Sequence, residues 1–402
     1  MVGQIRRLTR PIRTDDGDMH ALAVYSHREK GRWCIVSAKE SGWEGVACVD
    51  DVARAAWLFL DVWEQYRLVP ARNYAEGFLA FVRSMQQEDG RFINFISDWE
   101  GEANEAGRTS YPGGPWWTAR AVVALARSVA VLGDQGDLDR IRRAWPVVQA
   151  MGEHHDIRPL HILAALDLER ATGDEAWLND VRIWADELMA SRDEEGRLLN
   201  APSLPTFHFW GHIQPAALAL AGARLQWPAY IEAAEQSAKL LIEPMVRGGF
   251  AMPRVQPYDV SSCIFSLKTL YEVTRRPEYW EMVHLARAWF RGLNPARKPV
   301  YDPVSGLCHD GIDGEEVNQH SGAESNIEAA FALFEELPWP YLLGSAETRS
   351  PSARKTGRKV GSRAKGVKTF KEAVVVGGPK APAPSKEPAR SEDFVPLAPG
   401  LR

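Results

Sequence analysis

Apolar residues recur with a helical period through most of the chain. Eleven segments carry apolar side chains at positions i, i+3, i+4 and i+7, which is the spacing of an amphipathic helix with one buried face. These segments are 51–66, 74–85, 119–132, 138–151, 160–171, 176–189, 213–225, 230–242, 263–273, 279–290 and 327–337. The pattern therefore predicts an all-α body of about eleven helices.

The connections between these helices alternate in length. Short turns with Pro or Gly, such as Leu68-Val69-Pro70 and Gly173-Asp174, follow the first helix of most pairs. Long irregular segments follow most second helices, over 87–115, 191–210, 244–262 and 292–322. The first helices begin near residues 50, 116, 160, 209, 261 and 321, so the pairs repeat at an average interval of about 54 residues.

Six helix pairs at one loose period predict a closed ring. A helical hairpin cannot bury its own apolar stripe, so neighbouring pairs must supply the core for one another. We expect an (α/α)6 toroid in which the first helices form an inner barrel and the second helices an outer one. Pro338-Trp339-Pro340 ends the last pair early, so no twelfth helix is predicted. The alternation of short and long loops disfavours the alternative, an open superhelical solenoid.

The loop pattern also predicts where a site lies. In such a ring the long loops emerge on the face that holds the N-terminal ends of the inner helices. Those ends carry unpaired N–H groups and partial positive charge. A cleft on that face has walls of loops and a floor of helix ends, which is where we expect a ligand to bind.

The first turns of the predicted inner helices are rich in charged and aromatic residues. Indole rings stack against the apolar faces of sugars, while carboxylates, amides and guanidinium groups bind their hydroxyls, so this composition is typical of a carbohydrate cleft. The candidate substrate-binding residues are Arg54, Trp116, Trp117, Arg120, His208, Trp210, His212, Asn318 and His320. Of Trp116 and Trp117, we expect one in the cleft and one in the core, since neighbours on a helix face different ways.

Three carboxylates are the candidate catalytic groups. Asp50 or Asp51 on the first inner helix and Glu324 on the last are adjacent around a closed ring, so they can face one another across one cleft. Glycoside hydrolysis needs such a pair, with one proton donor and one base or nucleophile. The alternative is structural, because Asp caps helix N-termini well and Glu in a first turn stabilises the helix dipole. Asp310 and Asp313 are weaker candidates.

Composition and charge indicate which parts of the chain fold and which kinds of partner are disfavoured. The chain has 402 residues, 15 of them Trp, and a formal net charge of −5. Residues 345–402 hold 13 Lys and Arg against 5 Asp and Glu and are rich in Pro, Ala, Ser and Gly, so we predict a disordered basic tail. The acidic body does not favour nucleic acid as a partner. The predicted organisation is a lead-in segment (1–44), a toroid domain (45–344) and the tail (345–402).

The remaining features favour a cytoplasmic protein without a cofactor. No apolar run approaches the roughly 18 residues of a membrane span, and no signal-like apolar segment follows the N-terminal arginines. Four scattered cysteines suit a reducing compartment. Cys263, Cys308 and His309 could supply a zinc site, but the surroundings of Cys263 have the pattern of a helix core, so neither a metal nor a cofactor is predicted.

Several motifs resemble a known superfamily. Val49-Asp50-Asp51-x-Ala53-Arg54-Ala55, Gln86-x-x-Asp89-Gly90-Arg91-Phe92-x-Asn94-Phe95 and Trp289-Phe290-x-Gly292-x-Asn294 are similar to those of the six-hairpin glycosidase-like superfamily. Gly322-Ala323-Glu324-Ser325 and the segment from Tyr301 to Gly311 resemble helical domains found beside or fused to bacterial glycosyltransferases and sugar-processing enzymes. The resemblance covers residues 45 to 337 and implies the toroid fold and a carbohydrate context, without fixing a reaction.

One departure from the relatives concerns the segment before the second inner helix. Where they have an acidic stretch, this chain has Thr109-Ser110-Tyr111-Pro112-Gly113-Gly114-Pro115. If that acidic stretch helps catalysis, Glu102 or Glu105 must take its place.

The sequence analysis favours hydrolysis of a glycosidic bond by Glu324 and Asp51, or Asp50. One alternative is a non-catalytic module that binds a glycan or a glycosyltransferase. Another is a sugar isomerase, epimerase or lyase on the same scaffold, with histidines as bases.

Overall fold

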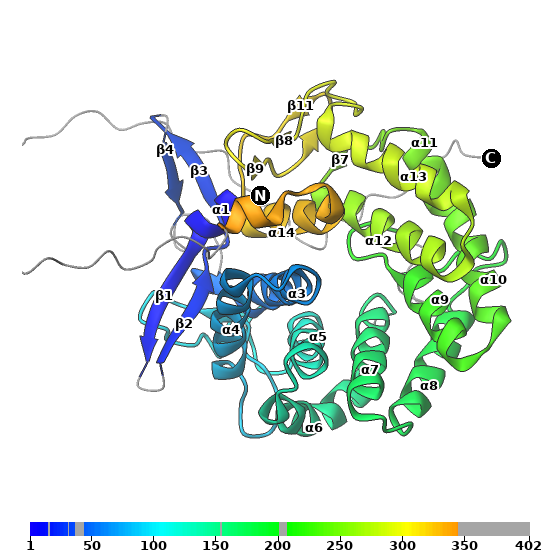
Figure 1. Ribbon diagram of the computed structural model, residues 1–402, viewed down its shortest axis with the longest axis horizontal. Helices are drawn as coiled ribbons and strands as arrows, with labels where there is room; N and C mark the ends of the chain where they lie inside the picture. Colours follow the sequence, from blue (N-terminus) through cyan, green and yellow to red (C-terminus); the bar gives the residue numbers. More distant parts are fainter. Residues whose placement is uncertain (15–16, 31, 37–43, 153–154, 201–206, 345–402) are drawn as a thin grey trace, which may run out of the picture.

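The computed structural model is a closed double ring of helices (Figure 1). It describes residues 1–14, 17–30, 32–36, 44–152, 155–200 and 207–344. The inner ring consists of α3 (Val49–Tyr66), α5 (Pro115–Leu132), α7 (Arg158–Thr172), α9 (Gln214–Leu225), α12 (Pro257–Thr274) and α14 (Ala323–Ala332). Each inner helix contacts the next, and α14 returns to α3. The predicted (α/α)6 toroid is confirmed.

The outer ring follows the same order. It consists of α4 (Val69–Ser84), α6 (Gln135–Ala150), α8 (Trp177–Ala190), α10 (Pro228–Ser237) and α13 (Pro277–Ala288). A π-helical turn (Ala238–Ile242) and α11 (Glu243–Arg247) prolong α10, and a 3-10 turn (Trp289–Arg291) prolongs α13. All eleven segments with helical periodicity are helical in the structure.

The helix boundaries follow from local chemistry. Proline stands in the first turn of α5, α7, α9 and α12, where its missing N–H has no intrahelical partner to lose. Gly133 and Gly173 end α5 and α7 in the left-handed conformation, which glycine adopts without steric cost. Gln256 and Asp259 form a capping box that fixes the start of α12.

Two short helices take the place of a long twelfth helix. After α14 and the 3-10 turn Phe334–Glu336, the chain forms only α15 (Trp339–Leu343). This helix contacts α1 (Val2–Leu8), and the two pack against α3 and α14. The side chain of Trp339 is fully buried and donates from Nε1 to the carbonyl of Phe334. Residues from both ends of the described chain thus complete the last helix pair.

Short strands surround one side of the ring and were not predicted. β1 (Thr9–Thr14) pairs with β2 (Gly17–Leu22), and β3 (Ser26–Glu29) pairs with β4 (Arg32–Ile35), both antiparallel. Within the loops, β5 (Ala47–Cys48) pairs with β6 (Phe95–Ile96), and β8 (Tyr301–Asp302) pairs with β9 (Leu307–Cys308). β10 (Ile312–Asp313) lies between β7 (Arg254–Val255) and β11 (Glu316–Val317). β5 to β11 pair segments of the loops with one another, whereas β2 packs against α4.

Two sequence-based expectations concern other parts of the chain. Within the described ranges, no helix is both long and apolar enough to cross a membrane. The predicted disordered tail, 345–402, lies outside the described residues.

Candidate functional site

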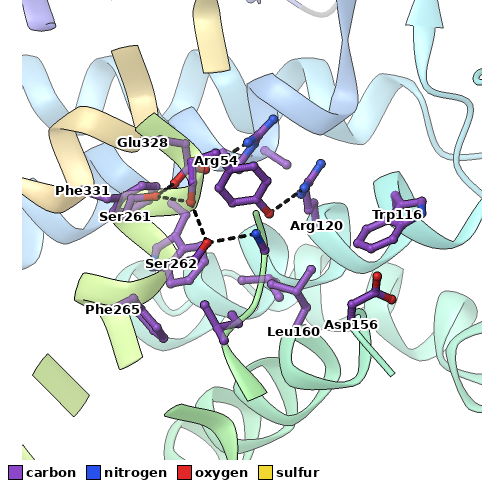
Figure 2. Close-up of a pocket in the computed structure, with 16 residues that line it drawn as sticks. Arg54, Trp116, Arg120, Asp156, Leu160, Ser261, Ser262, Phe265, Glu328 and Phe331 are labelled. Atoms are coloured by element: carbon purple, nitrogen blue, oxygen red, sulfur yellow. Dashed lines mark hydrogen bonds and ion pairs between the residues drawn. The ribbon is translucent and has the colours of Figure 1, made fainter. Parts of the chain in front are cut away.

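A cavity of about 60 Å³ lies at the centre of the inner ring (Figure 2). Helices α3, α5, α7, α12 and α14 and the loops before α7 and α9 contribute its walls. The lining residues are Ala53, Arg54, Trp57, Trp116, Arg120, Val123, Asp156, Leu160, Gly211, Ile213, Tyr258, Ser261, Ser262, Phe265, Glu328 and Phe331. Pockets that enclose drug-sized ligands measure roughly 300–1,000 Å³, so we expect this cavity to enclose no more than one sugar unit.

The cavity is polar toward the N-terminal ends of the inner helices and apolar further in. Arg54, Arg120 and Tyr258 lie in the first or second turn of their helices, whereas Trp57 and Phe265 lie about one turn deeper. This gradient follows from the sequence, because the lining residues in the third turn of α3, α5, α12 and α14 are apolar. The arrangement suits a ligand with hydroxyls at one end and a C–H surface at the other.

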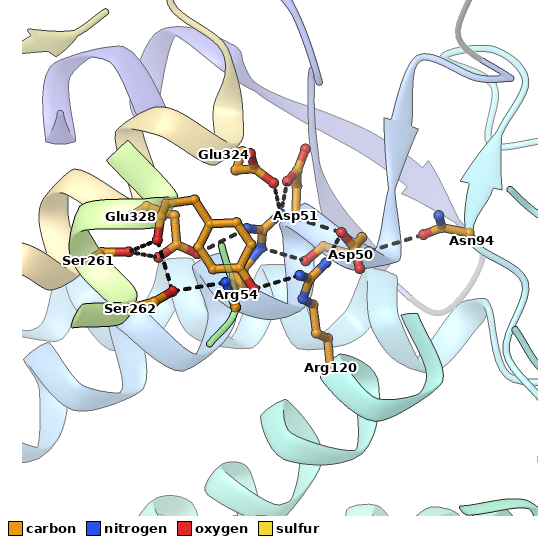
Figure 3. Close-up of polar contacts among 11 residues, drawn as sticks. Asp50, Asp51, Arg54, Asn94, Arg120, Ser261, Ser262, Glu324 and Glu328 are labelled. Carbon is orange, nitrogen blue, oxygen red and sulfur yellow. Dashed lines mark hydrogen bonds and ion pairs between the residues drawn. The ribbon is translucent and has the colours of Figure 1, made fainter. Parts of the chain in front are cut away.

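Arg54 lies at the centre of a cluster of four carboxylates (Figure 3). Its Nη2 donates to Asp51 at 2.7 Å and to Glu324 at 2.9 Å, and its Nη1 donates to Glu328 at 2.9 Å. Asp50 lies 3.4 Å from the same Nη2. The guanidinium is 5 % exposed, so these buried contacts connect the first and last inner helices.

A second arginine extends the cluster to α5 and α12. Arg120 donates to Asp50 and, at 2.8 Å, to the hydroxyl of Tyr258. The Tyr258 ring lies between the two guanidinium groups, 5.1 Å from Arg54 and 5.5 Å from Arg120. Burial raises the pKa of Tyr258 to about 12. The phenol is therefore neutral and keeps its own proton available for a hydrogen bond.

Burial also changes the protonation of the carboxyl groups. It raises the pKa of Asp51 to about 7, because loss of solvent outweighs the opposing effect of Arg54. The pKa of Glu328 is raised by burial as well, although Ser261 donates to Glu328 Oε2 at 2.6 Å. The cluster has more carboxyls than guanidinium groups, so retaining a proton on Asp51 near neutral pH reduces the excess of negative charge.

The predicted catalytic carboxylates therefore lie close together, but both bind the same cation, the guanidinium group of Arg54. Because Asp51 Oδ1 and Glu324 Oε2 both lie within 3 Å of Arg54 Nη2, they are within about 6 Å of each other, closer than the ~6.5–9.5 Å of an inverting pair. Asp51 is 3 % exposed, whereas the Glu324 side chain is 39 % exposed. Arg54 and Arg120 are likewise committed to internal ion pairs rather than free for an anionic ligand.

A histidine and a carboxylate form a separate pair on another side of the cavity, where Asp156 lines the wall and His208 does not. His208 Nε2 lies 3.5 Å from Asp156 Oδ2, and Asp156 lines the cavity. His208 Nδ1 lies 2.9 Å from the carbonyl oxygen of Trp210, which can only accept, so Nδ1 carries a hydrogen. This tautomer directs the Nε2 lone pair at Asp156, and the two groups can hold a proton between them.

The two neighbouring tryptophans differ as expected. Trp116 lines the cavity, and its ring lies 5.4 Å from Trp210, which in turn stacks on His208 at 3.6 Å. Trp117 is buried instead, with Nε1 donating to the carbonyl of Phe92 at 2.8 Å and its ring against Gly114. Trp117 is therefore a packing residue and does not reach the cavity.

The other predicted binding residues also lie outside the cavity lining. His212 is fully buried against Phe207, and burial lowers its pKa to about 3. Asn318 and His320 lie on the rim in the loop that precedes α14, where Asn318 donates to Asp313 at 3.0 Å. The structure thus brings together Asp50, Asp51, Arg54, Arg120 and Glu324, but neither His212 nor Asn318 joins them.

The motifs around Asp50 and Asn94 position this cluster. Asn94 accepts from the backbone N–H of Asp50 and donates to the carbonyl of Thr109, so the 109–115 segment supports Asn94 rather than supplying an acid. Glu102 and Glu105 are exposed and do not line the cavity. Neither glutamate takes the place of the missing acidic stretch.

Sequence reasoning missed two lining carboxylates. Glu328 follows Glu324 at the i+4 spacing that puts both on one helix face, and that spacing could have identified it. Asp156 lies in a loop, where no periodic pattern predicts which side chains face the site. Only the histidines near it in the sequence pointed to this segment. Among the described residues, no group of three or more His, Cys, Asp and Glu side chains is arranged to hold a metal ion.

Comparisons with solved structures identify the fold. A D-mannose isomerase matches with a TM-score of 0.61 and 10 % identity over 85 % of this chain and 95 % of that chain. A sugar epimerase from a ruminal bacterium matches with a TM-score of 0.59 and 13 % identity over 84 % and 99 %. A family 76 glycoside hydrolase from a bovine Bacteroides thetaiotaomicron strain matches with a TM-score of 0.55 and 13 % identity over 77 % and 74 %.

No protein-family model matches the sequence, and no curated protein matches it. The solved structures show that the chain has the fold of the six-hairpin glycosidase-like superfamily, and at 10–13 % identity they show the fold alone.

Proposed function

We propose that the chain binds a sugar in the central cavity and catalyses isomerisation or epimerisation at the carbon next to its carbonyl group. The observation that carries this proposal is the contact between His208 and Asp156, in which the imidazole Nε2 faces the carboxylate of a cavity-lining residue at 3.5 Å. A proton-transferring group is what such a reaction requires, and histidine transfers protons near neutral pH.

Residues in and beside the cavity have matching roles in this proposal. His208, oriented by the Trp210 carbonyl, removes the proton from the carbon next to the carbonyl. The resulting enediolate oxygen accepts a hydrogen bond from the neutral hydroxyl of Tyr258, beside the positive charge of Arg120. In isomerisation of an aldose, the hydroxyl proton on O2 passes to O1 and His208 returns its proton to C1, which leaves the carbonyl at C2. In epimerisation, the enediolate turns about the C2–C3 bond and His208 returns its proton to the opposite face of C2. Trp116 packs against the C–H face of the sugar.

The structural comparisons support the chemical class. The matched proteins include a D-mannose isomerase and three sugar epimerases, a cellobiose 2-epimerase from Spirochaeta thermophila among them, beside a family 76 glycoside hydrolase and an endoglucanase. The small volume of the cavity limits what can bind inside it to no more than one sugar unit. Four scattered cysteines and the resemblance to domains beside glycosyltransferases extend the proposal to a cytoplasmic protein that works next to such an enzyme.

Hydrolysis of a glycosidic bond is the second candidate. The pKa of about 7 at Asp51 suits a general acid, and its separation of less than about 6 Å from Glu324 fits a retaining mechanism. Arg54 counts against it, because one guanidinium binds both carboxyl groups and Asp51 is almost fully buried.

Deuterium incorporation distinguishes the two reactions. We would incubate the full chain in D2O with glucose, mannose, cellobiose, mannobiose and longer oligosaccharides, and follow the products by NMR and mass spectrometry. Isomerisation or epimerisation introduces deuterium at the carbon next to the carbonyl and leaves glycosidic bonds intact. Hydrolysis releases new reducing ends without that exchange.

Matched variants identify the catalytic group. His208→Asn should abolish exchange, whereas His284→Asn, at an exposed position on α13, should not change it. Product formation that survives His208→Asn but is lost in Glu324→Gln would overturn the isomerase proposal in favour of hydrolysis. Sugars that raise the melting temperature without any turnover would instead identify a glycan-binding module.

A further inference from the structure

Trp210 and Gly211 occupy the two central positions of a tight turn beside the cavity. The N–H of His212 donates to the carbonyl of Phe209 at 3.0 Å, which closes the turn. Gly211 has a φ of +68°, whereas the φ of Trp210 is not positive. This combination defines a type II turn, in which the third residue is left-handed. The turn therefore needs a glycine at this position.

The peptide group between Trp210 and Gly211 can take two orientations. Type I and type II turns differ by a rotation of this central peptide by about 180°, while the ends of the turn stay in place. In the orientation present, the Trp210 carbonyl oxygen lies 2.9 Å from Nδ1 of His208 and accepts its hydrogen. The opposite orientation would direct the Gly211 N–H toward His208 instead. Nδ1 would then have to accept, and the ring hydrogen would move to Nε2.

Ser262 on α12 holds the peptide in the observed orientation (Figure 2). The Gly211 N–H points away from the Trp210 carbonyl, as in any trans peptide, and donates to Ser262 Oγ at 2.9 Å. Ser262 Oγ donates its own hydrogen to the carbonyl of Tyr258 at 2.8 Å. Because a hydroxyl has only one hydrogen, Ser262 can only accept from the peptide. A reversed peptide would place the Trp210 carbonyl against this oxygen, and the Ser262 hydrogen would have to leave Tyr258.

The other neighbours of the His208 ring do not determine its tautomer. The ring stacks on the Trp210 indole, with centroids 3.6 Å apart and an interplanar angle of 7°. This contact fixes the plane of the imidazole but not the position of its hydrogen. Nε2 lies 3.5 Å from Asp156 Oδ2, which accepts when ionised and can donate when protonated. The Trp210 carbonyl can only accept, so the orientation of its peptide determines which ring nitrogen carries the hydrogen.

We infer that Ser262 is a positioning residue for His208, because it holds the peptide between Trp210 and Gly211 so that the ring hydrogen stays on Nδ1 and Nε2 stays free to take up a proton. Ser262 acts through the peptide rather than on the sugar. Its effect on the reaction rests on the proposed function, in which His208 takes a proton from the substrate. Its effect on the tautomer does not depend on which reaction the cavity performs.

Nitrogen NMR of the full chain with isotope-labelled histidine shows which ring nitrogen carries the hydrogen. We would record spectra up to a pH of about 9, well above the ordinary range of histidine titration, and identify the His208 signals by their loss in His208→Asn. In the unmodified chain we expect the hydrogen on Nδ1. Ser262→Ala removes the acceptor of the peptide N–H, so a second population with Nδ1 unprotonated should appear. Ser262→Thr keeps a hydroxyl and should restore the single Nδ1–H form.

Ser266→Ala is the matched control. Ser266 is buried one turn further along α12, and its hydroxyl has no hydrogen-bond partner among the described residues. This variant should leave the His208 signals unchanged. An unprotonated Nδ1 in the unmodified chain, or His208 signals in Ser262→Ala identical to those of the unmodified chain, would overturn the inference.

Deuterium exchange into the sugar, measured on the same variants, tests the effect on the reaction. One hydrogen bond shifts an equilibrium by about two- to tenfold, so exchange should slow by about that factor in Ser262→Ala and recover in Ser262→Thr. Absence of exchange in the unmodified chain would contradict the proposed function, whereas the NMR spectra would still decide whether Ser262 sets the tautomer. The two failures are therefore distinguishable.

Discussion

Arg54 on α3 and Glu328 on α14 are joined by a hydrogen bond of 2.9 Å, although 274 positions separate them in the chain. The bond closes the inner ring between its first and last helices, which is the one junction between hairpins that are not adjacent in the sequence. Ser261 on α12 donates to the other oxygen of Glu328, so the closure includes a third helix. The central charges therefore have a structural role whatever chemistry the cavity performs.

Replacing Arg54 with methionine should destabilise the protein strongly. The substitution removes the cation from a buried cluster and leaves Asp51 and Glu328 without their charge partner. Breaking a buried ion pair from one side costs about 3–5 kcal/mol. Denaturant unfolding measures the loss, with Arg72→Met as the control. Arg72 and Glu76 form an exposed pair, and such pairs contribute about 1 kcal/mol or less. Equal stability of both variants would contradict the structural role.

The raised pKa of Asp51 predicts a pH dependence of stability. Its folded-state pKa of about 7 exceeds the ordinary value of 3.8 because of burial, so between these values the native state binds more protons than the unfolded state. The free energy of unfolding should therefore fall as pH rises from about 4 to 7, by up to about 1.4 kcal/mol per unit from this group. Asp51→Asn should flatten that slope, and Asp139→Asn on the exposed face of α6 should not. An unchanged slope in Asp51→Asn would refute the assignment.

Gly211→Ala should impair the cavity more than the fold. Gly211 has a φ of +68°, and a Cβ there would lie 2.8 Å from the hydroxyl oxygen of Tyr258. Gly133→Ala is the matched control, because its φ is +72° and nothing lies within 4 Å of the new Cβ. Both variants should lose about 1–2 kcal/mol of stability from backbone strain. Only Gly211→Ala should also weaken sugar binding, and equal binding by the two variants would argue against a functional role for Tyr258.

Alanine substitutions of the two neighbouring tryptophans should have different effects, one on stability and the other on sugar binding. Trp117→Ala removes a buried ring and its hydrogen bond to Phe92, so unfolding should become easier by about 3–5 kcal/mol. Trp116→Ala removes a half-buried ring at the cavity wall and should mainly weaken sugar binding. Thermal unfolding and calorimetry on both variants make the comparison. The opposite pattern would mean that Trp117 faces the ligand.

The helices and their ring were predictable because each is long enough to show its period several times. The rim strands were not, since two-residue strands such as β5 and β6 contain no alternation to detect. The lead-in segment carries its own short helix, α1, whose seven residues are too few for a periodic signal.

Within the site, the sequence predicted which residues near the starts of the inner helices face the centre, but it did not predict the residues that they contact. Asp50, Asp51, Arg54 and Glu324 were predictable because ring closure makes the first and last helices neighbours. That Trp116 rather than Trp117 faces the cavity depends on the rotation of α5 about its axis, which the sequence of the helix alone does not specify. Asp156 was not singled out because its position depends on how a loop folds over the ring mouth.

Ring closure across 274 positions also has a consequence for biosynthesis. While the ribosome is still translating the later hairpins, α3 has already emerged with Asp50, Asp51 and Arg54, but its partners on α14 do not yet exist. The nascent chain must persist as an open arc with the apolar flank of its first hairpin uncovered until the final helix pair arrives. Such late, non-local contacts slow folding and prolong exposure to aggregation, so we expect the yield of soluble protein to depend on chaperone capacity during synthesis.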